Sequence, residues 1–182
     1  ASMLMPVGVY GYEYYSTNFR QNYAADCFSW FYVVADRNNT KIEITPSNPT
    51  RDGLPANVPF IITLNKGEVY QVLGAIQSGS RGYDMTGSRA KAIPNSDGKC
   101  HPYCSGLEST GNGDYINQQN FPNQAWGRRY LVAPTSNSSS ASSFHQNIFR
   151  VVVKDPTTVV LRNGVTLTGL VNNRFYEFDS QT

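Results

Sequence analysis

The sequence predicts an all-β fold in which two related antiparallel β-sandwich-like units follow one another in tandem. Segments with helical periodicity are almost absent, whereas short runs of β-branched and aromatic residues recur between turns rich in Gly, Pro, Asn and Asp. Aromatic residues make up 13% of the 182 residues, and charged residues make up 15%. An ordinary soluble domain has roughly 25% charged residues. This composition is typical of a β-rich surface or secreted protein.

Several strands are expected in the first half of the chain. Residues 28–35 (FSWFYVVA) form a near-continuous apolar run, as expected of a central strand. After a polar turn, residues 40–44 (TKIEI) alternate strictly, which directs Ile42 and Ile44 to the core. Residues 59–64 (PFIITL) and 68–73 (EVYQVL) flank the turn Asn65-Lys66-Gly67 and predict a β-hairpin.

The second half contains the strongest hairpin signal. Asn163-Gly164 lies between two apolar strand segments, and both residue types tolerate the positive φ that a tight turn of this kind requires. Residues 175–178 (FYEF) predict a strand close to the last residue, and the first residues resemble the middle of a strand without a signal peptide. We therefore expect the chain to be a fragment of a larger secreted protein.

An internal repeat divides the chain. The matching segments, in chain order, are Pro6-x3-Tyr10-Gly11-x2-Tyr14 with Pro122-x3-Trp126-Gly127-x2-Tyr130, Val33-Val34 and Thr40 with Val151-Val152 and Thr158, and Val69-Tyr70-x-Val72 with Phe175-Tyr176-x-Phe178. The repeat predicts a first β-unit over residues 1–115, which includes an irregular Cys-containing loop, and a second, truncated unit over residues 116–182.

Charge and hydropathy exclude some classes of partner. The formal net charge is +2 and there is no basic run, so the chain has no electrostatic footprint for nucleic acid. No apolar stretch approaches the roughly 20 residues of a membrane-spanning helix, so no membrane insertion is expected.

Four tyrosines are candidate binding residues. Tyr10, Tyr12 and Tyr14 alternate along one predicted strand and are expected to share one face, and Tyr23 follows among Asn and Gln residues. Exposed tyrosines suit contacts with a protein or a sugar because each combines an apolar ring with a polar hydroxyl. The alternative is that these rings fill the core between two sheets.

The sequence leaves open whether the three cysteines are free thiols or form a disulfide. Cys100 and Cys104 are close enough in sequence for a disulfide across a tight loop, and unpaired thiols are the alternative. Cys27 lies in aromatic sequence and is expected to be a buried thiol. A structural zinc site needs four nitrogen or sulfur ligands, commonly in two pairs. Beside Cys100, His101 and Cys104 the sequence offers only a distant His145 or Cys27, so the second pair is missing.

No cofactor is predicted, although calcium remains open. Asp36, Asn38, Asn39 and Asp84 carry oxygens that Ca²⁺ favours. The same residue types form turns by bonding their own backbone, which is the simpler interpretation.

No catalytic group is expected. The two histidines, His101 and His145, lie in loop-like sequence away from any Gly-x-Ser-x-Gly elbow. The acidic residues are scattered, whereas glycoside hydrolysis requires a pair held in one cleft. We therefore expect that the chain is not an enzyme.

The chain resembles the N-terminal-type domain of IgG Fc-binding proteins found in bacterial (Bacteroidetes-like) secreted and cell-surface proteins. The motifs that carry the resemblance are residues 3–6 (MLMP), 10–15 (YGYEYY), 30–40 (WFYVVADRNNT), 58–60 (VPF), 63–70 (TLNKGEVY), 84–88 (DMTGS), 126–130 (WGRRY), 133–134 (AP), 155–160 (DPTTVV) and 175–178 (FYEF). The family usually begins further upstream, and it typically has a strand where this chain has residues 100–106 (CHPYCSG). The resemblance implies immunoglobulin or mucin-like partners, and it supplies no catalytic residues.

The sequence therefore predicts a non-enzymatic binding or adhesion module at the cell surface or outside the cell. Its expected partner is a protein or a glycan on a surface, or further copies of itself. The alternatives are a structural subunit of a surface filament or layer, and a carbohydrate-binding module.

Overall fold

The computed structural model describes residues 4–22, 24–111, 114–133, 136–137, 140–144 and 147–179, and it confirms the all-β prediction. The described residues form antiparallel sheets and the short 3₁₀ turns η1 (Val7–Val9) and η2 (Asn123–Ala125). The chain divides into unit 1, residues Ala1–Ala125, and unit 2, residues Trp126–Thr182. The expected boundary after residue 115 falls inside β10 (Asp114–Gln119), which pairs with β9 (Tyr103–Gly111) of unit 1.

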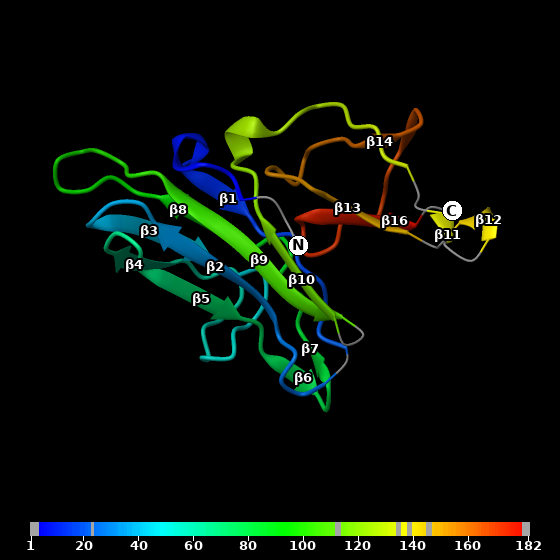
Figure 1. Ribbon diagram of the computed structural model, residues 1–182, viewed down its shortest axis with the longest axis horizontal. Helices are drawn as coiled ribbons and strands as arrows, with labels where there is room; N and C mark the ends of the chain where they lie inside the picture. Colours follow the sequence, from blue (N-terminus) through cyan, green and yellow to red (C-terminus); the bar gives the residue numbers. More distant parts are fainter. Residues whose placement is uncertain are drawn as a thin grey trace. The chain divides into compact units, whose positions relative to one another are not determined.

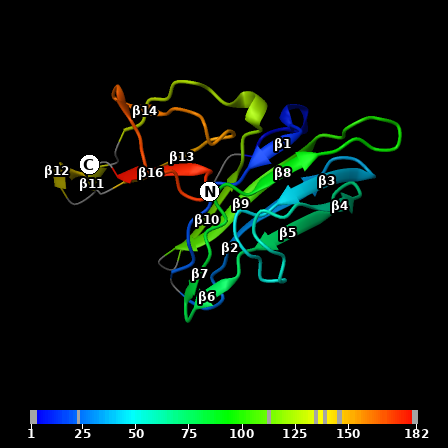
Figure 2. The same cartoon turned by 180° about the vertical axis from the view of Figure 1, so that it is seen from behind.

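Unit 1 contains two four-stranded sheets. The first has the order β1-β8-β3-β4 and is built from β1 (Glu13–Tyr15), β8 (Arg89–Ala92), β3 (Thr40–Thr45) and β4 (Phe60–Leu64). The second has the order β10-β9-β2-β5 and adds β2 (Ser29–Ala35) and β5 (Val69–Leu73). Figure 1 shows these strands running across unit 1, and Figure 2 shows them from behind. A small hairpin of β6 (Ile76–Ser78) and β7 (Arg81–Gly82) forms a separate two-stranded sheet.

One hydrophobic core joins the inner faces of both sheets, as in a β-sandwich. Phe31 and Val33 of β2 enter it from one sheet, and Ile42 and Ile44 of β3 enter it from the other. Because side chains alternate along a strand, the residues between them face outwards. The strict alternation of residues 40–44 therefore predicted the buried face of β3 correctly.

The predicted hairpin of residues 59–73 is wrong in its pairing. Its two strands exist as β4 and β5, but β4 pairs with β3 and β5 pairs with β2, in different sheets. The turn at Asn65-Lys66-Gly67 thus carries the chain from one sheet to the other. Gly67, with φ of 81°, adopts the left-handed conformation there.

The described residues of unit 2 form short two-stranded sheets. They pair β11 (Ser136–Asn137) with β12 (Ser140–Phe144), β13 (Ile148–Val152) with β16 (Phe175–Asp179), and β14 (Leu161–Arg162) with β15 (Val165–Thr166). The last pair confirms the hairpin predicted at Asn163-Gly164, where φ is 50° and 85° respectively.

Candidate functional site

The three alternating tyrosines do not share one strand. Tyr10 and Tyr12 precede β1, because η1 and an isolated bridge at Gly11 interrupt the extended chain before Glu13. Tyr12 is 45% exposed, whereas Tyr14 is 1% exposed and belongs to the core. The expectation of a single tyrosine face is therefore wrong, and Tyr23 lies outside the described residues.

Tyr14 has a structural role at the junction of the two sheets. Its hydroxyl accepts a hydrogen bond from the Gly11 amide at 2.7 Å and donates one to the Tyr103 carbonyl oxygen at 2.7 Å. The Tyr14 and Tyr103 rings lie 5.1 Å apart. Burial raises the pKa of Tyr14, so its hydroxyl remains a donor across the physiological range.

Replacing each of the two buried tyrosines by phenylalanine should change the free energy of unfolding in opposite directions. The Tyr103 hydroxyl is buried without a hydrogen-bond partner, so Tyr103→Phe should raise the free energy of unfolding by about 1 kcal/mol. Tyr14→Phe should lower it by about 2 kcal/mol, because the buried Gly11 amide then loses its acceptor. Urea denaturation of both variants measures the two changes, and a loss of stability in Tyr103→Phe would contradict the first.

Aromatic side chains gather on the outer side of the second sheet of unit 1. In β2 the inward residues are buried, and Trp30, Tyr32 and Val34 face outwards with partial exposure. The Trp30 and Tyr32 rings are 5.9 Å apart and tilted by 46°. Val69 of β5, opposite Val34, is 59% exposed. We call these residues, together with Tyr10, the outer aromatic face.

Gly106 is what allows the Tyr32 ring to lie across β9. The two residues are opposite each other in the β2–β9 register. A Cβ atom at Gly106 would lie 2.2 Å from Cζ and 2.3 Å from the hydroxyl oxygen of Tyr32. Because Gly106 has no side chain, the ring can occupy that space, and its position on the outer aromatic face is fixed by β9.

Tyr10 joins this face through Cys104. Cys104 points outwards from β9 opposite Val34, and Tyr10 lies beside it. Burial raises the pKa of the Cys104 thiol and is also the largest cause of the raised pKa of Tyr10. The thiol is therefore held protonated, which makes it a poor nucleophile.

Cys27, Cys100 and Cys104 are free thiols in the structure, which is the alternative to the Cys100–Cys104 disulfide that the sequence leaves open. Cys100 packs against the core and approaches the Ala92 carbonyl oxygen, with Sγ 3.9 Å away. Cys104 instead lies on the outer side of β9, next to the inward residue Tyr103. The two thiols thus belong to different sides of the sheet. Cys27 is partly exposed rather than buried.

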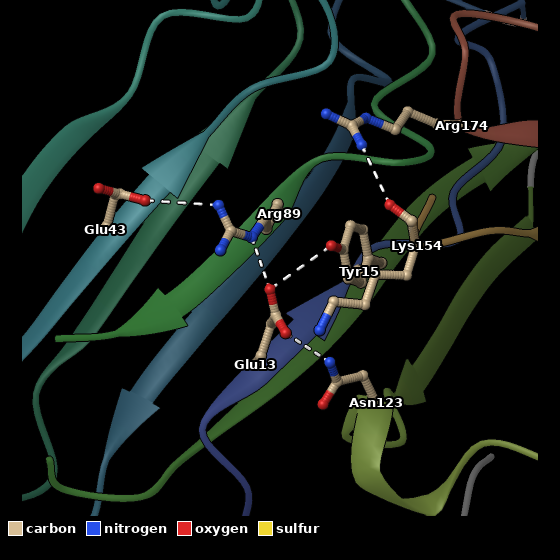
Figure 3. A network of polar contacts seen from close by, with 7 residues as sticks. All are labelled: Glu13, Tyr15, Glu43, Arg89, Asn123, Lys154 and Arg174. Atoms are coloured by element: carbon tan, nitrogen blue, oxygen red, sulfur yellow. Dashed lines mark hydrogen bonds and ion pairs between the residues drawn. The ribbon is translucent and has the colours of Figure 1, made fainter. Parts of the chain in front are cut away.

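A polar network crosses the outer side of the first sheet (Figure 3). Arg89 of β8 contacts Glu13 of β1 at 2.7 Å and Glu43 of β3 at 3.5 Å. Tyr15 donates a hydrogen bond to Glu13 at 3.5 Å, and Asn123 of η2 donates another. Burial lowers the pKa of Arg89, but the hydrogen bond and charge of Glu13 outweigh it and leave that pKa raised. Arg89 therefore links three strands through its contacts with two carboxylates.

Three of the side chains considered for calcium have polar contacts with other residues. Asp84 accepts hydrogen bonds from the amide and hydroxyl of Thr86, at 2.9 and 2.6 Å. Asn38 accepts one from the Lys66 amide at 3.1 Å, and Asp36 lies 3.8 Å from Arg37. The contacts of Asp84 are those of a side chain that bonds its own turn two residues further on.

In the part of the chain that the structure describes, no three His, Cys, Asp or Glu side chains are arranged to hold a metal ion. His101 is partly buried, and His145 lies outside the described residues. Among the described helical elements there is none long and apolar enough to cross a membrane.

The outer aromatic face and the Arg89 network are the features that sequence reasoning missed. Residues 28–35 look like a fully buried strand, so their alternation between inner and outer sides leaves no clear periodic signal. Glu13 and Arg89 are far apart in sequence, and only the pairing of β1 with β8 brings them together.

Comparison with known proteins identifies the family of the chain. No curated protein and no solved structure matches the chain. A family model described as "IgGFc binding protein" matches residues 1–182, the full length of the sequence. The chain therefore belongs to the IgGFc-binding protein family.

Proposed function

We propose that this chain is a non-enzymatic, extracellular protein-binding module that contacts its partner through the outer aromatic face of unit 1. The family supports a protein partner, because its description names the Fc part of immunoglobulin G. The observation that carries the proposal is the outward position of Trp30 and Tyr32 on the central strand of a sheet. Tyrosine and tryptophan are enriched at protein interfaces and among the residues that dominate binding energy.

The geometry of this face favours a protein over a glycan. A sugar ring stacks best on a flat aromatic surface, whereas the Trp30 and Tyr32 rings are tilted by 46° to each other. Val34 and the exposed Val69 extend the face with aliphatic rather than polar side chains. A mixed aromatic and aliphatic patch on a rigid sheet is suited to packing against protein side chains.

The module belongs to a larger secreted or cell-surface protein and serves adhesion. A structural subunit of a filament or layer is the competing class, and it would bind copies of itself. Sedimentation of the purified chain distinguishes the two, because self-assembly at micromolar concentration would favour the filament.

Binding to an immobilised IgG Fc fragment tests the partner and the face together. The double variant Trp30→Ala/Tyr32→Ala should bind at least about tenfold more weakly than the unaltered chain, because buried aromatic anchors carry most of an interface's energy. Ile61→Ala is the matched control, since Ile61 is 60% exposed on the outer side of the other sheet. Equal binding by the double variant and the control would remove the outer aromatic face from the proposal. No Fc binding by the unaltered chain, together with hits on a glycan array, would favour the carbohydrate alternative.

A further inference from the structure

Arg51 lies on the same side of the second sheet as the outer aromatic face. Thr50 and Gly74 form an isolated antiparallel bridge, and the Arg51 amide donates to the Leu73 carbonyl oxygen at 2.9 Å. In this register Arg51 is opposite Leu73, and Leu73 is opposite Trp30 of β2. Residues that are directly opposite each other share one face of a sheet, so Arg51, Leu73 and Trp30 form one row across the outer side.

The guanidinium group of Arg51 is held over an aromatic ring. Its Cζ atom lies 4.5 Å from the centroid of the buried Phe28 ring, a cation–π contact. Phe28 is two residues before Trp30, which brings the cation to the Trp30 end of the outer aromatic face. The backbone of Arg51 is fixed as well, because the Leu54 amide closes its turn by donating to the Thr50 hydroxyl at 3.0 Å.

No acidic side chain of the described residues compensates the charge of Arg51. Burial and then the charge of Asp52 raise the pKa of Tyr70, which packs against the core, so the neighbouring Asp52 lies near Tyr70. Three other arginines of the chain do have a carboxylate partner: Arg37, Arg89 and Arg150. The Arg51 side chain is thus an exposed, positioned cation whose N–H donors are available to a ligand.

We infer that Arg51 is the specificity-determining residue of the outer aromatic face and that it binds the carboxylate of an aspartate or glutamate side chain on the partner protein. This rests on the proposed function and adds the chemistry of the partner's surface. A guanidinium group presents its N–H donors in a planar fork that matches the two oxygens of a carboxylate. Because the Phe28 ring already holds that fork, binding costs little further side-chain freedom.

The row of residues defines the pattern that the partner must present. A cation, an aliphatic side chain and an aromatic ring follow one another at Arg51, Leu73 and Trp30, over two strand spacings, or roughly 10 Å. The matching surface therefore has an acidic side chain beside the apolar residues that pack on Trp30. Contact with these apolar groups removes water from the ion pair, which strengthens the attraction between its charges.

Fc binding by charge variants tests the inference within the proposed interface. Arg51→Gln should weaken binding about tenfold, the effect of a charge-assisted hydrogen bond, and Arg51→Lys should recover part of the loss because it keeps the charge without the planar fork. Lys91→Gln is the matched control, since it removes the same charge from an exposed side chain on the outer side of the other sheet. It should bind like the unaltered chain. An equal loss in Arg51→Gln and Lys91→Gln would show an effect of net charge and overturn the inference.

Salt gives a second measurement on the same samples. Raising the salt concentration from about 50 to 500 mM should weaken Fc binding of the unaltered chain more than that of Arg51→Gln, because the variant lacks the charge that salt screens. An identical dependence on salt in the two proteins would contradict a role of the Arg51 charge in binding.

Two tripeptides test the carboxylate without relying on Fc. Acetyl-Leu-Glu-Leu-amide and acetyl-Leu-Gln-Leu-amide have the same shape, and only the first has a charged side chain. In nuclear magnetic resonance titrations of the intact chain, up to about 10 mM peptide, the acidic peptide should shift the Arg51 Nε–H and Trp30 indole signals and bind at least about fivefold more tightly. Arg51→Gln should abolish this difference at the Trp30 signal.

The two sets of measurements separate the inference from the proposed function. Equal binding of the two peptides to the unaltered chain would overturn the role of Arg51, whether or not Fc binds. A preference for the acidic peptide that is lost in Arg51→Gln, in a chain that does not bind Fc, would support the carboxylate site and count against the Fc partner alone.

Discussion

Gly11→Ala should lower the free energy of unfolding of unit 1 by about 3 kcal/mol, at the upper end of the cost of overpacking. A Cβ atom at Gly11 would lie 2.3 Å from Cβ of Pro122, and the rigid ring of a buried proline cannot turn aside. The backbone of Gly11 is also fixed, because its amide bonds to Tyr14 and its carbonyl oxygen to Tyr103. Chemical denaturation followed by tryptophan fluorescence measures the change.

The matched control for this prediction is Gly127→Ala, at the repeat counterpart. There the nearest atom to an added Cβ is Cζ of Tyr130 at 3.6 Å, an ordinary contact. We expect a change of no more than about 0.5 kcal/mol. If Gly11→Ala were as mild as Gly127→Ala, Pro122 would not be packed against Gly11 as the structure has it.

Arg89→Met should lower the free energy of unfolding by about 2 kcal/mol. Glu13 is 7% exposed, and the substitution removes the guanidinium that lies 2.7 Å from its carboxylate. Breaking a buried ion pair by deleting one partner costs about 3–5 kcal/mol, and partial exposure of Arg89 reduces that figure. Denaturant unfolding of the single variants and of Glu13→Gln/Arg89→Met forms a double-mutant cycle.

The double variant decides the physical origin of the loss. We expect Glu13→Gln/Arg89→Met to be more stable than Arg89→Met alone, because a neutral amide is less costly to bury than a carboxylate that has lost its guanidinium. Strictly additive single effects would show that the two residues do not act as a pair.

Part of the fold is determined locally, and the sequence predicts that part well. The alternation of residues 40–44 gives the buried face of β3, and Asn163-Gly164 gives the β14–β15 turn. Both signals depend on neighbouring residues only. The pairing of β4 and β5 could not be predicted in this way. A turn such as residues 65–67 can close a hairpin or cross between sheets, and the choice depends on which distant strands bury the apolar faces.

The candidate sites follow the same division. The tyrosine-rich segment was recognised, but which of its rings are buried depends on η1 and on the bridge from Gly11 to Tyr103, and neither leaves a periodic signal. Trp30 and Tyr32 become an outer surface only because β9 and β5 flank β2 in the same sheet. The position of the Tyr32 ring further depends on Gly106, which lies far away in the sequence.

By itself, the sequence determined that this protein is all-β, that residues 40–44 alternate along a strand, and that two segments share a repeated pattern. Composition and period-two alternation are local properties, so they can be recognised without knowledge of the fold. Only the tertiary structure decided which sheet each strand joins, that Arg89 meets Glu13, and that Tyr14 is covered while Tyr130 is exposed. These depend on contacts between residues far apart in the chain, which form when two sheets bury their apolar faces against one core.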